Sequence, residues 1–147
     1  MQSAERPTKL LIPALAGFYE WVKPYGYPLI RFTVGALIIP EGYFKIMSGF
    51  DATATGMARQ DFWLPAVTAF LVITTETVGG FCVAIGFLTR FWAAAIAIEM
   101  AVLTFYVQWH NGYGRVAVFA LWGIVAFVVA LRGGGRCSVD RLIGREL

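Results

Sequence analysis

The chain has 147 residues, of which 59% are hydrophobic and 14% are charged, and its mean hydropathy is +0.68. Soluble domains carry about 25% charged residues, so this composition excludes an ordinary soluble enzyme and predicts a membrane protein. The formal charge of +3 is spread along the chain rather than gathered in one patch, and we therefore expect no nucleic-acid partner.

The first apolar run of the chain is too short to cross a membrane. Pro13 interrupts it and no small-residue cleavage site follows, so we expect no removable signal peptide. Residues 9–22 are instead predicted to lie at the membrane interface as a partly amphipathic helix.

Four later segments are predicted to cross the bilayer as helices: residues 27–47, 64–87, 91–109 and 116–131. Together they use most of the chain and leave no room for a soluble catalytic domain. The sequence therefore predicts an all-α fold, an integral membrane four-helix bundle with a short N-terminal interfacial segment.

Three prolines lie in or just before the first span. Pro24 and Pro28 favour a helix start, because the first turn of a helix does not need the backbone N–H that proline lacks. Pro40 should bend the same span, since it leaves the carbonyl of Ala36 without its helical partner.

The connections between the spans predict how the helices pair. Residues 48–62 lack a long apolar run and are expected to form a lid or a short surface helix. Residues 86–90 and 110–115 are short, so they place the second span antiparallel to the third, and the fourth beside the third. Small residues at four-residue spacing, such as Gly80 and Ala84, predict close helix contacts.

The basic residues predict the orientation in the membrane. In the four-span topology one side of the bilayer would receive most of them: Arg6, Lys9, Lys23, Arg31, Arg90, Arg132, Arg136, Arg141 and Arg145. Only Lys45, Arg59 and Arg115 fall on the other side. The positive-inside rule then puts both termini in the cytoplasm.

We accordingly expect one membrane domain over residues 1–147. Residues 1–26 would form its cytoplasmic or interfacial start, residues 27–131 the four membrane helices, and residues 132–147 a cytoplasmic tail.

Two glutamates, Glu76 and Glu99, lie in the middle of the second and third spans. A carboxylate at bilayer depth is costly, so such a residue usually faces the protein interior and marks a proton, ion or substrate path. Counting from the short connection between the two spans places both at similar depth, where they could face each other. Two such groups cannot readily both ionise, so one should hold a proton unless Arg31 or Lys45 compensates. The structural alternative is a protonated Glu that only holds two helices together.

Further polar and aromatic residues extend this candidate site. Helical spacing puts Glu41 and Lys45 within one turn, where they could pair, and puts Trp92, Tyr106 and His110 on the Glu99 stripe of the third span. The predicted site therefore has Glu76 and Glu99 as catalytic residues and a substrate-binding or quinone-binding set of Arg31, Glu41, Lys45, Trp92, Tyr106 and His110. No metal is expected, because the sequence has no metal-ligand spacing.

The stretch Glu76, Thr77, Val78, Gly79, Gly80, followed by Gly86, Phe87, Leu88, Thr89, Arg90, resembles the E-x-x-G-G … G-x-x-T-R signature of the DoxX family. Shorter matches agree with it: Arg31, Gly35, Gly42, Lys45, Met100 and the tail from Gly133 to Asp140. The resemblance implies a four-helix protein of the bacterial inner membrane. Family members include the membrane subunit of a thiosulfate:quinone oxidoreductase, but most have no established activity. This chain departs from many members by having Glu41 where they carry His.

The leading interpretation is a membrane subunit of a quinone-linked or other redox complex, with a proton-handling carboxylate pair between helices. A quinone is the candidate cofactor, and because the sequence has no motif for an electron carrier of its own, a partner redox subunit would supply the electrons. A small proton-coupled transporter and a non-enzymatic assembly subunit are the alternatives. The sequence leaves open whether the protein is an enzyme and whether it forms a homo-oligomer.

Overall fold

The computed structural model describes residues 11–144. Its helices follow one another as α1 (Ala16–Ser48), α2 (Phe50–Arg59), α3 (Pro65–Thr74), α4 (Gly80–Ile85), α5 (Thr89–Val102), α6 (Tyr113–Arg132) and α7 (Val139–Ile143). A 3-10 turn η1 (Pro13–Leu15) precedes α1, and two π-helical segments, η2 (Thr75–Gly79) and η3 (Leu103–Val107), join or extend α3, α4 and α5. No strand forms within the described part of the chain.

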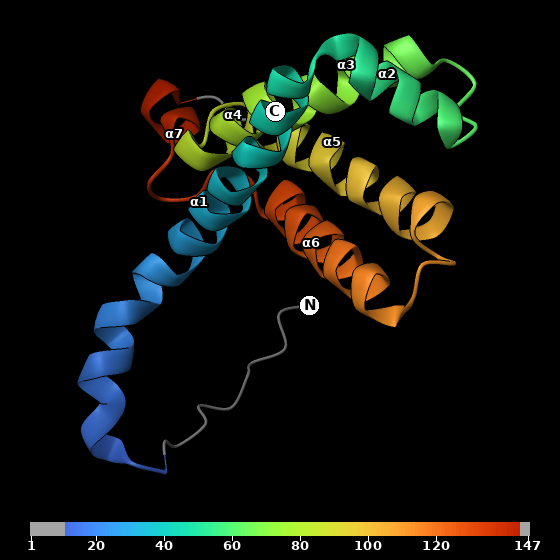
Figure 1. Cartoon of the computed structure of the whole chain (residues 1–147). Coiled ribbons are helices and arrows are strands. Elements are labelled where there is room, and N and C mark those ends of the chain that lie inside the picture. Colours follow the sequence, from blue (N-terminus) through green and yellow to red (C-terminus); the bar gives the residue numbers. More distant parts are fainter. Residues whose placement is uncertain (1–10, 145–147) are drawn as a thin grey trace, which may run out of the picture.

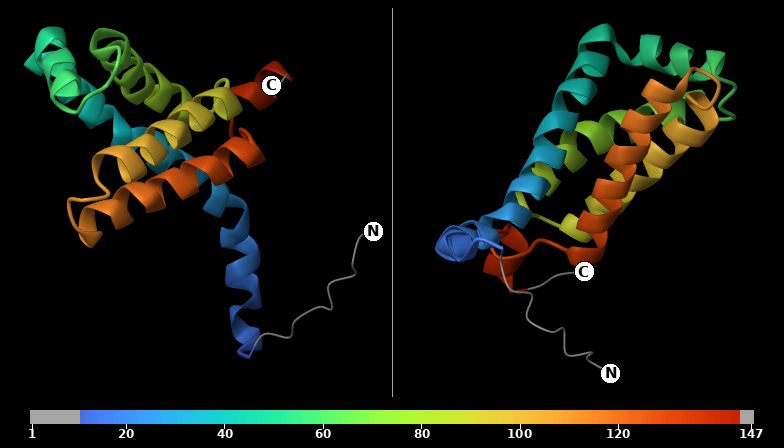
Figure 2. Two further views of the ribbon diagram at one scale, coloured as in Figure 1. Left: turned by 90° about the vertical axis from the view of Figure 1, so that its right-hand side faces the viewer. Right: turned by 90° about the horizontal axis from the view of Figure 1, so that it is seen from below.

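The molecule is a bundle of four long helical rods, as predicted. The rods are α1, the continuous α3–η2–α4 unit, α5 with η3, and α6 (Figures 1 and 2). α2 and the turn before α6 lie at one end, which we call the α2 end, and the turn between α4 and α5 lies at the other, the tail end, together with α7 (Figure 1). α2 confirms the short helix expected in residues 48–62.

Three of the rods are long and apolar enough to cross a membrane: Pro65–Ile85, Thr89–Val107 and Tyr113–Arg132. α1 is not among them, although it has 33 residues. The reason lies in its charges, because Arg31, Glu41 and Lys45 interrupt its apolar surface. The Arg31 side chain is buried and Lys45 is half-buried within the bundle, so the protein rather than lipid surrounds these two charges.

The predicted start of the first span is wrong. α1 begins at Ala16, and both Pro24 and Pro28 lie inside it. Helices tolerate interior proline at some cost by bending, and Figure 1 shows the first turns of α1 turned away from the bundle as a projecting arm. The second half of the expected interfacial helix is therefore the beginning of α1; Lys9 and Leu10 lie outside the described residues.

Glycines allow α1 to lie very close to η2 and α4. A Cβ atom at Gly35 would lie 2.9 Å from Cα of Ala84 and closer still to backbone atoms of Ala84 and Gly80. One at Gly80 would lie 2.6 Å from the Ile38 side chain. The small-residue spacing in the second span thus serves contact with the first span, as in other membrane helix pairs.

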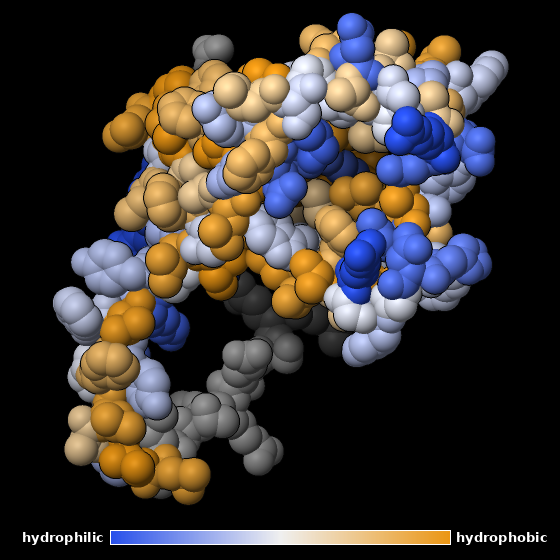
Figure 3. All heavy atoms as spheres, in the orientation of Figure 1, coloured by the Kyte–Doolittle hydropathy of each residue, from blue (hydrophilic) through white to orange (hydrophobic). Residues whose placement is uncertain are grey.

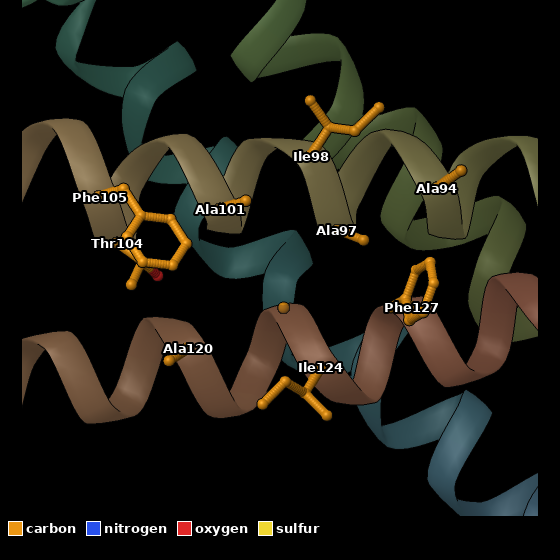
Figure 4. Close-up of a pocket in the computed structure, with 10 residues that line it drawn as sticks. Ala94, Ala97, Ile98, Ala101, Thr104, Phe105, Ala120, Ile124 and Phe127 are labelled. Carbon is orange, nitrogen blue, oxygen red and sulfur yellow. The ribbon is translucent and has the colours of Figure 1, made fainter.

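α5 and α6 form the second closely packed pair. A Cβ atom at Gly123 on α6 would lie in van der Waals contact with the α5 backbone, 3.8 Å from the Ala97 carbonyl oxygen and 3.9 Å from the Ala101 nitrogen. Between the two helices runs an apolar groove of about 470 Å³, walled by small side chains and by Ile98, Phe105 and Phe127 (Figure 4). No ionisable residue lines this groove, so it offers van der Waals contact but no proton chemistry.

The tail is tied to the turn between α4 and α5. The Asp140 carboxylate accepts hydrogen bonds from the backbone N–H groups of Leu88 (2.7 Å) and Thr89 (3.0 Å) and from the Thr89 hydroxyl (2.7 Å). The Asp140 backbone N–H in turn donates to the carbonyl of Gly86 at 2.9 Å. Asp140 therefore satisfies the free N–H groups at the start of α5, which is the task of an N-cap residue.

Arg31 completes this connection from α1. Its guanidinium donates to the carbonyls of Gly134, Cys137 (2.6 Å) and Ala84 (3.4 Å) and is almost fully buried. Gly86, with φ of +78°, lies directly against it, where any Cβ would meet the guanidinium at 2.7 Å. Arg31 thus fastens the tail to the bundle.

The surface agrees with a membrane environment. Figure 3 shows hydrophilic side chains gathered at the α2 end and hydrophobic ones over the arm and body of α1. Large apolar side chains are exposed along every rod, for example Leu37, Phe81, Ile98 and Ile124. Such broad exposure of apolar surface is stable only against lipid.

Substituting Gly35 by Ala should destabilise the bundle by about 1 to 3 kcal/mol, because the new methyl group meets backbone atoms that cannot move aside independently. Gly17→Ala is the control, since a Cβ at Gly17 meets nothing within 4 Å in the same helix. Unfolding of both variants in mixed micelles with rising SDS measures the difference. Equal stability of the two variants would contradict the close contact.

Asp140→Ala should lower the free energy of unfolding by about 2 to 3 kcal/mol, because three donors at the start of α5 lose a charged acceptor. Asp51→Ala removes an exposed carboxylate from the first turn of α2 and should cost under about 1 kcal/mol. The same unfolding titration tests both, and an Asp140 variant as stable as the Asp51 variant would show that the tail is not fastened in this way.

Candidate functional site

An ion pair between α1 and η2 lies at the centre of the candidate site. Lys45 Nζ lies 2.7 Å from Glu76 Oε1 and 2.6 Å from Oε2, so the ammonium group binds both carboxylate oxygens. The Glu76 side chain is 3% exposed and that of Lys45 is 27% exposed. Because a charge in a low-dielectric interior is strongly unfavourable alone, each of the two requires the other.

Local structure brings the two side chains together. A Cβ atom at Gly42 would lie 2.9 Å from Cβ of Glu76, so the missing side chain lets α1 approach η2 where Lys45, one turn later, reaches across. Glu76 lies in a π-helical turn, and such turns change the direction in which a side chain leaves the helix. The Thr77 hydroxyl donates to the Ile73 carbonyl at 2.6 Å and satisfies a backbone acceptor in this wider turn.

Glu99 lies beside this pair, and its carboxyl group is within hydrogen-bonding reach of that of Glu76. Both of its carboxylate oxygens are buried, and no N–H or O–H donor of the described residues reaches them, so Glu99 and Glu76 can share a hydrogen bond only if one of the two is protonated. The charges of Glu76 and Lys45 both act on it. A buried carboxyl group that no donor satisfies is rare in folded proteins, because leaving such a group unsatisfied costs free energy.

A cavity of about 370 Å³ connects these three residues. Its polar wall consists of Lys45, Glu76, Glu99, Thr68 and Thr75. The remaining wall is apolar and comes from α2 and its end, α3, α5 and η3: Met57, Phe62, Leu71, Val72, Ala95, Ile98, Val102 and Leu103. An apolar slot with a few convergent polar groups is the usual form of a small-molecule site.

A second cavity, of about 330 Å³, lies between α1, the α5–η3 rod and α6. Lys45 and Glu76 line this cavity too, together with Glu41 and the aromatic residues Phe119 and Trp122. The ion pair therefore borders both spaces, while Glu99 lines the first and Glu41 the second.

The predicted pairing of Glu41 with Lys45 does not occur. Lys45 reaches across to Glu76, and Glu41 is exposed at the second cavity. Lys45 pairs with Glu76 because an unpaired charge costs more free energy on the buried Glu76 than on the exposed Glu41.

The other predicted site residues lie farther from the ion pair. The Trp92 ring packs on Gly79, and its indole N–H is buried without an acceptor in the part of the chain described. Tyr106 donates a hydrogen bond to the Asp61 carbonyl at 3.2 Å and contacts the ring of Phe62. It therefore packs against a residue of the cavity wall without lining the cavity itself. His110 is exposed in the turn before α6, and Arg31 fastens the tail at the opposite end.

Sequence analysis did not identify the threonines that line the cavity or the lining residues that come from α2 and its end. Thr75 directly precedes Glu76 and Thr68 lies about two helical turns before it, but polar threonines in a membrane span are too common to single out. Met57 and Phe62 belong to the segment expected as a lid or surface helix, but only the fold shows that this segment covers the carboxylates. Within the described residues, no group of three His, Cys, Asp or Glu side chains is placed to hold a metal ion.

Comparison with known proteins found one family. The model of the DoxX family matches residues 26–109, which is more than half of the chain and includes α3, η2, α4 and α5 with η3 as well as most of α1. Comparison with curated proteins and with solved structures gave no significant match.

Replacing Lys45 by Met should destabilise the protein by about 3 to 5 kcal/mol, because it leaves the Glu76 carboxylate buried without its counter-charge. The double variant Lys45→Met with Glu76→Leu should be less destabilised than the single one, since no buried charge remains. Glu41→Gln is the matched control and should change little. Unfolding in mixed micelles measures all three, and a double variant less stable than the single Lys45 variant would contradict the charge argument.

Proposed function

The chain belongs to the DoxX family, and we propose that it is the membrane subunit of a quinone-linked redox complex whose quinone ring occupies the cavity beside Lys45, Glu76 and Glu99. The observation that carries the proposal is Glu99, a buried carboxyl group at the wall of an apolar cavity that no N–H or O–H donor of the described residues satisfies and that has only the Glu76 carboxyl beside it. A ligand that accepts a hydrogen bond from it would satisfy this group, and a quinone carbonyl is such an acceptor.

Charge balance assigns different roles to the two glutamates. Lys45 and Glu76 neutralise each other, so an ionised Glu99 would be an uncompensated negative charge, whereas a protonated Glu99 would not. Glu99 is therefore the exchangeable proton donor in this proposal, and Glu76 holds Lys45 in place beside it. Proton transfer requires hydrogen-bond distance between donor and acceptor, which the shared cavity allows.

Quinone reduction consumes two electrons and two protons and yields the quinol. The two electrons come from a redox centre of a partner subunit, since the sequence carries no motif for such a centre. Glu99 delivers protons one at a time and is reprotonated through the second cavity, which Lys45, Glu76 and Glu41 border. In this scheme the chain contributes only quinone binding and proton transfer.

The orientation of the charges supports an inner-membrane protein with both termini in the cytoplasm. The basic residues Lys23, Arg31, Arg90, Arg132, Arg136 and Arg141 lie toward the tail end, and Lys45, Arg59 and Arg115 toward the α2 end. Arg6, Lys9 and Arg145 lie outside the described residues. This bias agrees with the positive-inside rule, under which the carboxylate site would lie nearer the non-cytoplasmic face.

Glu99→Leu should weaken binding of a short-chain quinone about fivefold, as expected for the loss of one hydrogen bond of about 1 kcal/mol. Quenching of tryptophan fluorescence on titration of the purified protein with the quinone measures the affinity. Glu41→Gln, at the second cavity only, should bind as the wild type does. Absence of saturable binding by the intact protein would contradict the proposal and favour an assembly role.

Glu99→Gln separates binding from proton transfer, because an amide donates a hydrogen bond but cannot exchange the proton. Infrared difference spectra recorded on electrochemical reduction of bound quinone should show a change in the protonated-carboxyl region in the wild type. That band should vanish in Glu99→Gln and persist in Glu41→Gln. A band that survives in Glu99→Gln would assign the proton to another residue.

A further inference from the structure

A second polar pocket, remote from the carboxylate site, lies at the tail end of the bundle. It has a volume of about 360 Å³ and is lined by Glu20, Lys23, Tyr27, Arg132, Gly135 and Arg136, together with two prolines of α1. It lies where the projecting arm of α1 meets the end of α6 and the tail (Figure 2).

The pocket is positively charged. Lys23, Arg132 and Arg136 outnumber the single carboxylate, Glu20, and none of the four forms an ion pair within residues 11–144. Its positive charge therefore remains available to a bound anion.

The pocket is built on fixed contacts. Tyr27 donates hydrogen bonds to the carbonyls of Gly133 and Val129, which end α6, and its ring lies 4.4 Å below the guanidinium carbon of Arg132. Gly135, with φ of +73°, approaches the same ring so closely that a Cβ would lie 2.8 Å from it. Tyr27 thus holds both the guanidinium of Arg132 and the tail segment that carries Arg136.

The surroundings of the pocket are apolar and face outward. Leu29 is 64% exposed and Leu131 is 62% exposed, beside Pro28 and Arg132 of the pocket wall. On the arm, Trp21 and Tyr25 are exposed next to Lys23, as aromatic residues are at the membrane–water interface. A ligand here would have its anionic part among the basic groups and apolar parts along exposed leucines.

We propose that this pocket binds the headgroup of an anionic phospholipid, with the phosphodiester between Lys23, Arg132 and Arg136 and the acyl chains along the neighbouring apolar surface. Basic pockets at the membrane surface recognise lipid phosphates in this manner, and Arg is well suited to a phosphate because its planar fork can donate two parallel hydrogen bonds. The bound lipid would fix the arm of α1 against the bundle. The site is independent of the carboxylate cavity and of its proposed ligand.

Native mass spectrometry of the purified protein with added phosphatidylglycerol tests the proposal. Lys23→Gln and Arg136→Gln should each weaken retention of this lipid about fivefold, corresponding to about 1 kcal/mol per basic residue near the membrane surface, and the double variant more than either. Both side chains are exposed, so the variants should fold as the wild type does.

Arg115→Gln is the matched control, because it removes the same charge from the other end of α6. It should leave lipid retention unchanged, and an equal loss in this variant would overturn the proposal by showing that total charge alone matters. Phosphatidylcholine should bind more weakly than phosphatidylglycerol, and equal binding of the two would also overturn it. Inorganic phosphate and glycerol phosphate form the third arm: if either displaces the lipid at equal concentration, the pocket is a site for soluble phosphates instead.

Discussion

The arrangement of the whole bundle depends on the meeting of Lys45 and Glu76. Each charge would be prohibitive in a lipid-surrounded helix by itself, so the two must lie in contact, and this requires α1 to lie directly against η2. The glycines of α1 make this approach possible: Gly42 faces Glu76 itself, and Gly35 meets the backbone of α4 two turns earlier. A charged pair and a close glycine contact thus stabilise the same helix crossing, one through electrostatics and the other through backbone proximity.

The residues of the family signature divide into two structural groups. Glu76 and the following glycines belong to the crossing with α1 and α5, whereas Gly86, Thr89 and Arg90 belong to the tail end. Arg90 donates to the carbonyl of Leu131, and Thr89 binds Asp140, so the turn between α4 and α5 holds the last residues of α6 and the tail. The tail end is therefore a network of capped helix ends, whereas the two cavities beside the ion pair and the Glu99 carboxyl lie toward the α2 end.

The two ends of the bundle differ in how their buried polar groups are satisfied. At the tail end the buried charges have several partners: the Asp140 carboxylate accepts three hydrogen bonds and Arg31 donates to three carbonyls, while Arg31 Nε has no partner within the described residues. Around Glu99 no N–H or O–H donor satisfies the carboxyl group, and side chains of α2 and its end form part of the wall of the cavity beside it. Polar groups that converge on an apolar cavity are the usual form of a small-molecule site, and this arrangement is consistent with the proposed quinone site.

The sequence by itself determined the all-α membrane class, the number of long helices, the short helical hairpins and the central glutamates. Each of these follows from local composition: hydropathy over one span, a turn too short to cross back, and a charge at bilayer depth. It misplaced the start of α1, because proline at a helix start and proline within a bent helix look alike in a sequence.

Tertiary structure alone decided which charges pair. Glu41 is the acidic residue nearest to Lys45 along the chain, one helical turn away. Lys45 nevertheless binds Glu76 from another helix, since burial raises the free-energy cost of leaving Glu76 unpaired. In the same way Arg31 binds the tail, although its place in the first span suggested the carboxylate site. The π-helical turn at Glu76 could likewise not be predicted from the sequence, because helix pitch depends on packing against neighbours and not on residue spacing.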